Sequence, residues 1–296
     1  IFVPYRTYAK ILKWLAIALF AYPITAFIVG QPWGEIFTRT VIPDVKINKD
    51  TIYLIVGILG TTISPYLFFW NTSEVVEDEV AENRIKSSSG KGKPIISKRF
   101  IHKIRMDNVA GMSLATISAW FIIIACASTL HVHGITKIEN AQDAAAALEP
   151  LVRGFPNAGL VAKLLFSVGI IGIGLLAVPV LAGSSSYAIS EALGIKEGLY
   201  RSFNKAKGFY GIIALATLAG LIINFIGIDP IQALIFTAVF NAIATVPLLY
   251  MIWRVGNNHD VMGEYKNTRI SNIGVFTAFL VMAGATIVLF WSVLHQ

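Results

Sequence analysis

An apolar stretch at residues 52–71 is interrupted in its middle by residues that break helices and carry oxygen. Pro65 has no N–H, so the carbonyl of Thr61, four residues earlier, loses its helical hydrogen-bond partner. In a segment long enough to cross a bilayer, such a carbonyl is tolerated only where it faces a cavity or a ligand. Because broken helices in membrane proteins place unpaired carbonyls beside bound ions, this pattern predicts a cation site.

The ligands predicted at this site are all oxygen atoms. Thr61 would offer its carbonyl, Ser64 a hydroxyl and Tyr66 a phenol. Gly60 and Pro65 would let the helix open. Oxygen ligands suit magnesium, calcium or manganese better than copper or zinc. The alternative is a simple packing kink at the proline, but the flanking glycines and hydroxyls favour local unwinding.

Acidic residues follow the break on a predicted extension of the same helix. Glu74, Glu77 and Asp78 have the spacing of residues that share one helical face. They are interpreted either as a negative vestibule, which would concentrate cations and bind protons, or as a solvated helix end. Glu191, near the end of a later apolar stretch, is assigned to the same vestibule or to the membrane interface.

Two side-chain amides, Gln232 and Asn241, lie in another apolar stretch. They either complete the oxygen shell of the cation or hydrogen-bond neighbouring helices. The acidic run 77–79 has no second acidic motif and no nucleophile–base pair beside it. The sequence therefore predicts no enzyme, no catalytic residue and no cofactor, with the cation as substrate.

The composition is that of a polytopic membrane protein. Of 296 residues, 55% are apolar and 14% are charged, whereas soluble domains have about 25% charged residues. Seven apolar stretches approach the roughly 20 residues that a membrane helix needs. They are residues 14–30, 52–71, 109–130, 158–182, 209–228, 231–253 and 272–294.

The basic residues indicate how these spans are oriented. Of the 24 Lys and Arg residues, 18 lie before the first span or in alternate loops, five lie in the other loops, and Lys163 lies within a span. Because cytoplasmic loops carry such an excess, Ile1 and residues 72–106 are predicted to be cytoplasmic and Gln296 to be outside. The net charge of +7 therefore indicates topology and anionic lipid, with no nucleic acid as partner.

The chain is predicted to be one transmembrane domain, 1–296, taken from a longer protein. Ile1 is not an initiator methionine, and no signal-peptide pattern precedes the first apolar stretch. The expectation is a fragment that lacks N-terminal spans.

Several motifs resemble those of the NRAMP divalent-metal transporters. The stretch Gly57-Ile58-Leu59-Gly60-Thr61-Thr62-Ile63-Ser64-Pro65-Tyr66 is similar to the broken sixth helix of that family, which carries Met-Pro-His. The likeness continues through residues 69–71, 179–184, 209–210, 229–230 and 246–247. It extends along the whole chain and is closest to the prokaryotic NRAMP-like branch that lacks Met-Pro-His.

The resemblance implies an all-α, leucine-transporter-type fold of the APC superfamily, with these spans as the fifth to the eleventh of eleven. The family's first helix, with an Asp-Pro-Gly-Asn motif and two metal ligands, would be absent here. Thr61 matches the family's carbonyl ligand, in agreement with the argument from the break. Ser64 replaces the family's methionine and Tyr66 its histidine, which leaves the metal and the proton route open.

The resulting hypothesis is a secondary transporter of a divalent cation, magnesium or manganese-like, working by alternating access in a prokaryotic plasma membrane, with or without protons. The alternative is transport of an amino acid or another organic substrate on the same fold. A seven-helix receptor is disfavoured, because its first residue would have to be outside. The oligomeric state is left open.

Overall fold

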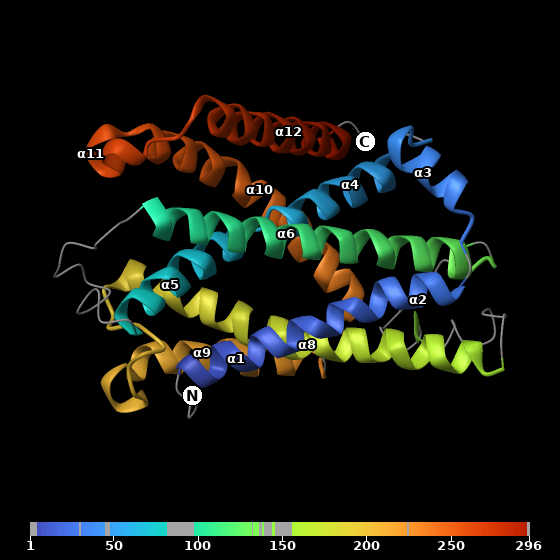
Figure 1. Cartoon of the computed structure of the whole chain (residues 1–296), viewed down its shortest axis with the longest axis horizontal. Helices are drawn as coiled ribbons and strands as arrows, with labels where there is room; N and C mark the ends of the chain where they lie inside the picture. The colour runs from blue at the N-terminus through green and yellow to red at the C-terminus, as the bar shows by residue number, and fades with distance from the viewer. Residues whose placement is uncertain are drawn as a thin grey trace. The chain divides into compact units, whose positions relative to one another are not determined.

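The structure, a computed structural model, is helical throughout the regular elements that it describes (Figure 1). It describes residues 5–29, 31–44, 48–81, 98–131, 133–135, 138, 144–145, 156–223 and 225–294. Within these residues, six stretches are long and apolar enough to cross a membrane. They are Lys10–Val29, Lys49–Val80, Lys98–His131, Ala158–Leu193, Pro230–Asn257 and Arg269–Ser292.

The remaining predicted span, residues 209–228, coincides with a shorter apolar helix, α9, Lys207–Ile223. Its 17 residues correspond to about 25 Å along the helix axis, near the lower limit for a membrane span. The chain is therefore a multi-pass helical membrane protein.

The helices form two compact units, which are described separately. Unit 1 comprises Ile1–Ile42 and Phe69–Asp229, and unit 2 comprises Pro43–Phe68 and Pro230–Gln296. Helix α5, Pro65–Ala81, contributes its first turn to unit 2 and the rest to unit 1.

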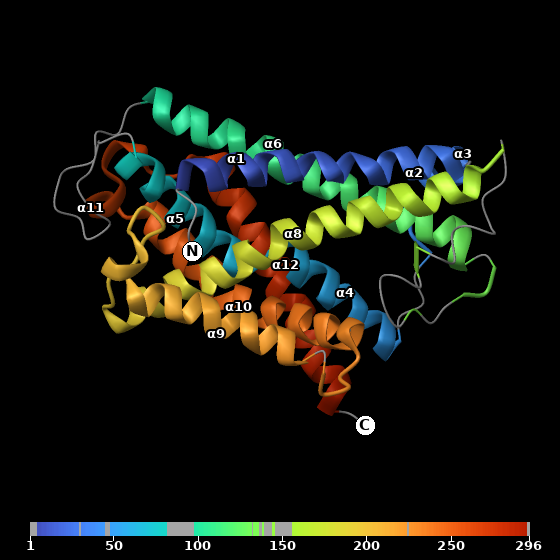
Figure 2. The same ribbon diagram turned by 90° about the horizontal axis from the view of Figure 1, so that it is seen from below.

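In unit 1 the long helix α8, Ala158–Leu193, packs against α2, Ala21–Val29, and against α9 (Figure 2). Helix α2 also packs against α6, Lys98–Cys126, and the rings of Tyr22 and Phe166 meet edge to face at 5.5 Å between α2 and α8. The further helical elements of the unit are α1 Tyr5–Leu15, η1 Ala16–Phe20, α3 Trp33–Val41, the π-helical turn η2 Ala127–His131 and η3 Phe203–Lys205.

Unit 2 is built on α4, Lys49–Thr62, α10, Pro230–Asn257, and α12, Arg269–Leu294. Helix α4 packs against both others, and their shared core is apolar. Its buried residues are Val56, Val239, Ala242, Leu249, Met282 and Leu289. Short turns, α11 His259–Met262 and η4 Gly263–Tyr265, lead from α10 to α12.

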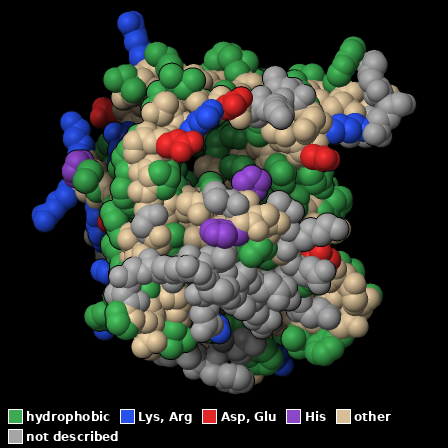
Figure 3. Space-filling view, turned by 90° about the vertical axis from the view of Figure 1, so that its right-hand side faces the viewer, with side chains coloured by type: hydrophobic (Ala, Val, Ile, Leu, Met, Phe, Trp, Pro, Cys, Tyr) green, Lys and Arg blue, Asp and Glu red, His purple; other side chains and the backbone are tan. Residues whose placement is uncertain are grey.

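Both units leave large hydrophobic side chains exposed, and Figure 3 shows such side chains over several parts of one face. Ile171 is 61% exposed, Phe236 66% and Trp291 64%. In water this exposure would be unfavourable, whereas hydrocarbon tails cover it without cost. It is the surface expected of helices that contact lipid.

Helices also occupy both ends of the predicted cytoplasmic loop 72–106. Helix α5 continues to Ala81, and α6 begins at Lys98. The acidic residues therefore extend the broken helix, as the sequence predicted. Residues 82–97 lie outside the described part of the chain, and the side of the membrane stays a prediction.

Candidate functional site

The predicted helix break is present at Ile63 and Ser64. Helix α4 ends at Thr62, and α5 begins at Pro65. Ile63 has φ −115° and ψ 79°, which is outside the helical region. Pro65 occupies the first position of α5, where an N–H would have no acceptor within α5 itself. Tyr66 follows in the same turn and is partly buried.

Ser64 compensates for the hydrogen bond that Pro65 cannot make. Its side chain is buried, and its Oγ lies 2.6 Å from the Gly60 carbonyl and 2.9 Å from the Thr61 carbonyl. A hydroxyl has one proton, so the two carbonyls share a single donor. The Thr61 carbonyl therefore keeps acceptor capacity for a ligand, and so does the Ser64 oxygen.

The threonine hydroxyls at the end of α4 donate back into their own helix. Thr61 Oγ1 lies 2.9 Å, and Thr62 Oγ1 2.8 Å, from the Ile58 carbonyl. Both side chains are exposed. The three predicted ligands, Thr61, Ser64 and Tyr66, thus fall at one break, and their role as ligands stays a prediction.

Helix α10 holds this end of α4 by direct backbone contact. A Cβ placed on Gly60 would lie 2.0 Å from the Ala238 carbonyl oxygen and 2.7 Å from the Ala242 nitrogen. Only glycine permits this approach. The sequence predicts that Gly60 lets the helix open, and the structure shows in addition that Gly60 allows α4 to pack closely on α10.

Thr245 is a residue at the break that the sequence did not reveal. Its Oγ1 lies 2.7 Å from the Ile63 carbonyl and 2.7 Å from the Asn241 carbonyl. A hydroxyl beside Pro247 was the available signal, and it does not identify a partner so distant in sequence. Asn241 is partly buried on the same helix, whereas Gln232 is exposed near its start. Support of the site by these amides stays a prediction.

The acidic residues of α5 face different neighbours within unit 1. Glu77 is 1% exposed and accepts hydrogen bonds from the Tyr187 hydroxyl and from the backbone N–H groups of Leu199 and Tyr200. Gly198, at φ +123°, allows the backbone of the α8–α9 loop to reach that carboxylate.

Glu74 and Asp78 instead line a cavity of about 140 Å³ together with Lys103 and Asp107 of α6. Adjacent residues on a helix point about 100° apart. Glu77 and Asp78 therefore diverge, although each is spaced to lie near Glu74. The structure places Glu77 in an interior contact and the other two at a polar cavity.

No group of three or more His, Cys, Asp or Glu side chains is arranged to hold a metal ion among the described residues. The carbonyl and hydroxyl oxygens at the break are the cation ligands that the sequence predicts. Their chemistry is that of hard-cation coordination.

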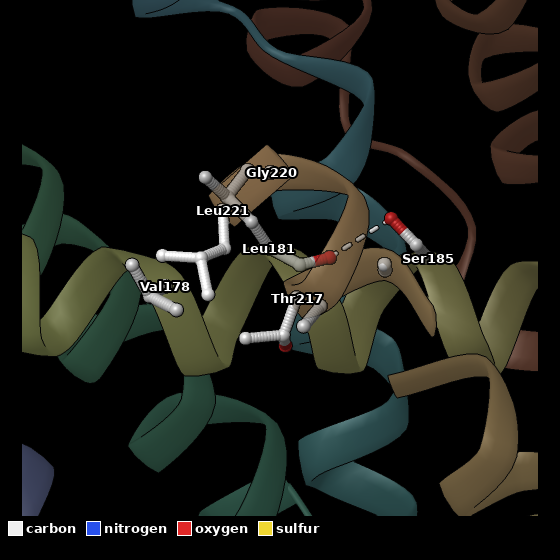
Figure 4. Close-up of a pocket in the computed structure, with 8 residues that line it drawn as sticks. Val178, Leu181, Ser185, Thr217, Gly220 and Leu221 are labelled. Atoms are coloured by element: carbon white, nitrogen blue, oxygen red, sulfur yellow. Dashed lines mark hydrogen bonds between the residues drawn. The ribbon is translucent and has the colours of Figure 1, made fainter. Parts of the chain in front are cut away.

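A larger cavity, of about 480 Å³, lies between α8 and α9 and does not have this chemistry (Figure 4). Its lining is mainly apolar, with Val178 and Leu181 on one side. Its two hydroxyls donate to their own helices, Ser185 to the Leu181 carbonyl at 2.9 Å and Thr217 to the Ile213 carbonyl at 2.8 Å. The cavity suits hydrocarbon rather than a cation.

Glu197, in the loop after α8, is a second acidic residue that the sequence did not single out. Its Oε2 is buried without a hydrogen-bond partner among the described residues. Burial raises the pKa of its carboxyl to about 7, and the charges of Glu191 and Glu77 act in the same direction. Arg201 opposes them. Glu191 itself is exposed in the last turn of α8.

Glu197 is expected to make the stability of unit 1 depend on pH. Its pKa of about 7 in the folded protein exceeds the ordinary value of 4.5. The protonated carboxyl therefore contributes fully to folding stability below pH 4.5, and this contribution is lost as the pH rises through about 7. Between about pH 5 and pH 8, the melting temperature of the Glu197→Gln variant should therefore fall less than that of the unmodified protein. Scanning fluorimetry in detergent measures this. Glu264→Gln, at an exposed position, should keep the original slope, and equal slopes for both variants would contradict the prediction.

Known proteins are similar to this chain along nearly its whole length. Residues 1–292 match the family model described as natural resistance-associated macrophage protein-like, Nramp. The chain is 28% identical over 274 residues to "Divalent metal cation transporter MntH" of Caldanaerobacter subterraneus subsp. tengcongensis, covering 90% of this chain and 57% of that protein.

Two further relatives carry similar names. The protein named MntH of Clostridium acetobutylicum is 26% identical, with 86% of this chain and 52% of the relative covered. "Divalent metal cation transporter MntH 1" of Pseudomonas aeruginosa is 26% identical, with 84% and 53% covered. This chain spans about half the length of the curated relatives that it matches. The family resemblance predicted from the sequence is confirmed, and the chain belongs to the Nramp family.

Proposed function

We propose that the protein containing this chain is a secondary transporter that moves a divalent metal cation across a membrane. The observation that carries the proposal is the break between α4 and α5 inside a helical stretch of membrane-spanning length. The names of the bacterial relatives, divalent metal cation transporters, support the same substrate class.

The cation is bound by the Thr61 carbonyl and the Ser64 hydroxyl, with the Tyr66 phenol nearby in the chain. These are oxygen ligands, and the thioether of the family's methionine is replaced by Ser64. Magnesium or a manganese-like ion is therefore the expected cargo. Resident cofactors have no part in this chemistry, because the bound ion is itself what is moved.

The transport cycle is alternating access around the interrupted helix, in the plasma membrane of a prokaryote with the Ile1 side cytoplasmic. Glu74 and Asp78, which line the polar cavity beyond the break, attract the cation and are the candidate carriers of any coupled proton. The bacterial origin of the relatives supports a prokaryotic plasma membrane as the location, and the distribution of Lys and Arg supports the orientation.

Isothermal titration of the complete protein in detergent tests the substrate class. Magnesium, manganese and a mixture of amino acids are titrated separately. Saturable heat with a divalent cation and none with amino acids is the expected result. The reverse pattern would replace the cation by an organic substrate on the same architecture.

Pro65→Ala is expected to reduce cation uptake. Alanine supplies an N–H at position 65, which can bond the Thr61 carbonyl and close the helix over the proposed ligand. We expect affinity to fall about tenfold, the equivalent of about 1.4 kcal/mol. Uptake into proteoliposomes containing a divalent-cation dye measures the change. Pro179→Ala, which removes a proline from the interior of α8 and leaves the break intact, is the control, and unchanged uptake with Pro65→Ala would argue against the site.

A further inference from the structure

The Ile63 carbonyl at the break has lost its own helical partner. In a continuous helix it would accept a hydrogen bond from the Leu67 N–H, four residues later. That N–H instead bonds the Ser64 carbonyl at 3.1 Å. A carbonyl left open at membrane depth is unfavourable, so another donor is needed.

Thr245 of α10 supplies that donor, and its one proton is shared between the Ile63 carbonyl and a carbonyl of its own helix. Its side chain is 0% exposed, and Oγ1 lies 2.7 Å from the Ile63 carbonyl. The same hydroxyl is 2.7 Å from the carbonyl of Asn241 in its own helix, an ordinary position for a helical threonine. The contact with Ile63 is the one that joins two elements of unit 2.

The packing of α4 on α10 fixes the register of this contact. Gly60 meets the backbone of Ala242, and Ile63 meets Thr245, each three residues further along its chain. A shift of either helix would break both contacts. The packing of α4 on α10 therefore determines the position of the Thr245 hydroxyl at the break.

We propose that Thr245 is a positioning residue that holds the α4–α5 break open. It binds the Ile63 carbonyl, so that this oxygen has a structural role while the Thr61 carbonyl remains available to the cation. Without the hydroxyl, the Ile63 carbonyl lacks a fixed donor, so the break loses its fixed conformation and the Ser64 hydroxyl is drawn away from Thr61. This inference rests on the proposed function, because it explains how the same cation site keeps its shape.

Thr245→Val and Thr245→Ser test the inference in the complete protein. Valine keeps the shape of the side chain and removes the hydroxyl, whereas serine keeps the hydroxyl. Hydrogen–deuterium exchange of residues 63–67 without cation should rise about tenfold in the valine variant and stay within about twofold in the serine variant. The dissociation constant for magnesium or manganese, measured per folded protein, should also rise in the valine variant and change little in the serine variant.

Thr237→Val is the matched control, because the Thr237 hydroxyl donates within its own helix, to the Ala233 carbonyl at 2.8 Å. It should leave exchange at residues 63–67 unchanged. If the valine variant at position 245 is not recovered folded, Thr245→Cys, with a similar size and a weak donor, is measured in its place.

The exchange experiment decides the inference even if no cation binds. Exchange that rises with valine and returns with serine supports it. Unchanged exchange in the valine variant overturns it, and so does an equal rise in both variants, because the hydroxyl is then not the cause. If exchange rises as expected but the unmodified protein binds neither magnesium nor manganese, the proposed function fails and the positioning role stands.

Discussion

Gly60→Ala is expected to destabilise unit 2 by roughly 1–3 kcal/mol, the usual cost of overpacking. The added Cβ would lie 2.0 Å from the Ala238 carbonyl oxygen and 2.7 Å from the Ala242 nitrogen. Because both are backbone atoms, no side-chain rotation relieves the clash and α10 has to move. That movement separates the Ile63 carbonyl from Thr245, so cation binding should weaken together with stability.

Gly57→Ala, one turn earlier on α4, is the matched control for this prediction. A Cβ there would meet Val239 at 3.7 Å and Ala238 at 3.9 Å, which is ordinary contact. Alanine is the better helix former by about 1 kcal/mol, so this variant should be neutral or more stable. Apparent melting temperatures in detergent compare the two. A Gly60→Ala variant as stable as Gly57→Ala would contradict the backbone contact between α4 and α10.

Glu77→Gln should destabilise unit 1 by about 3 kcal/mol, because it leaves a buried hydrogen-bond donor without an acceptor, which is costly. The carboxylate has two acceptor oxygens, which together bind the Tyr187 hydroxyl and the N–H groups of Leu199 and Tyr200. An amide replaces one oxygen by an NH₂ group, which would face a donor. The α8–α9 loop then loses its attachment to α5.

Asp78→Asn makes the same change from carboxyl to amide at the neighbouring, exposed position and serves as the control. Its effect should stay within about 0.5 kcal/mol, as for most surface substitutions. Melting temperature and the rate of proteolysis in the α8–α9 loop measure both variants. Equal stability of the two would show that the Glu77 carboxylate is not held as the structure has it.

Local features of the sequence were sufficient to predict the spans and the break. Apolar length determines whether a segment can cross a bilayer, and the predicted stretches overlap six long helical stretches and the shorter helix α9. The break depends on the missing N–H of Pro65 and on the hydroxyl of Ser64, both of which act within one helical turn. The distribution of basic residues predicts the topology from equally local information.

The direction in which each acidic side chain points was not predictable from spacing alone. Glu74, Glu77 and Asp78 have the spacing of residues that share a helical face. The neighbours that pack on that helix decide that Glu77 is buried against the α8–α9 loop while Asp78 lines a cavity. Glu197 acquires its raised pKa from burial and from charges on other elements. Its own sequence neighbourhood does not contain that information.

By itself, the sequence determined that this chain crosses a membrane several times, that one span is interrupted, and which family it belongs to. These properties follow from hydrophobic length, from the covalent structure of proline and from motifs read along the chain. The tertiary structure alone decided that Thr245 meets Ile63 and that Gly60 touches α10. Such contacts join residues far apart in sequence and depend on the register of packed helices, which no local pattern specifies.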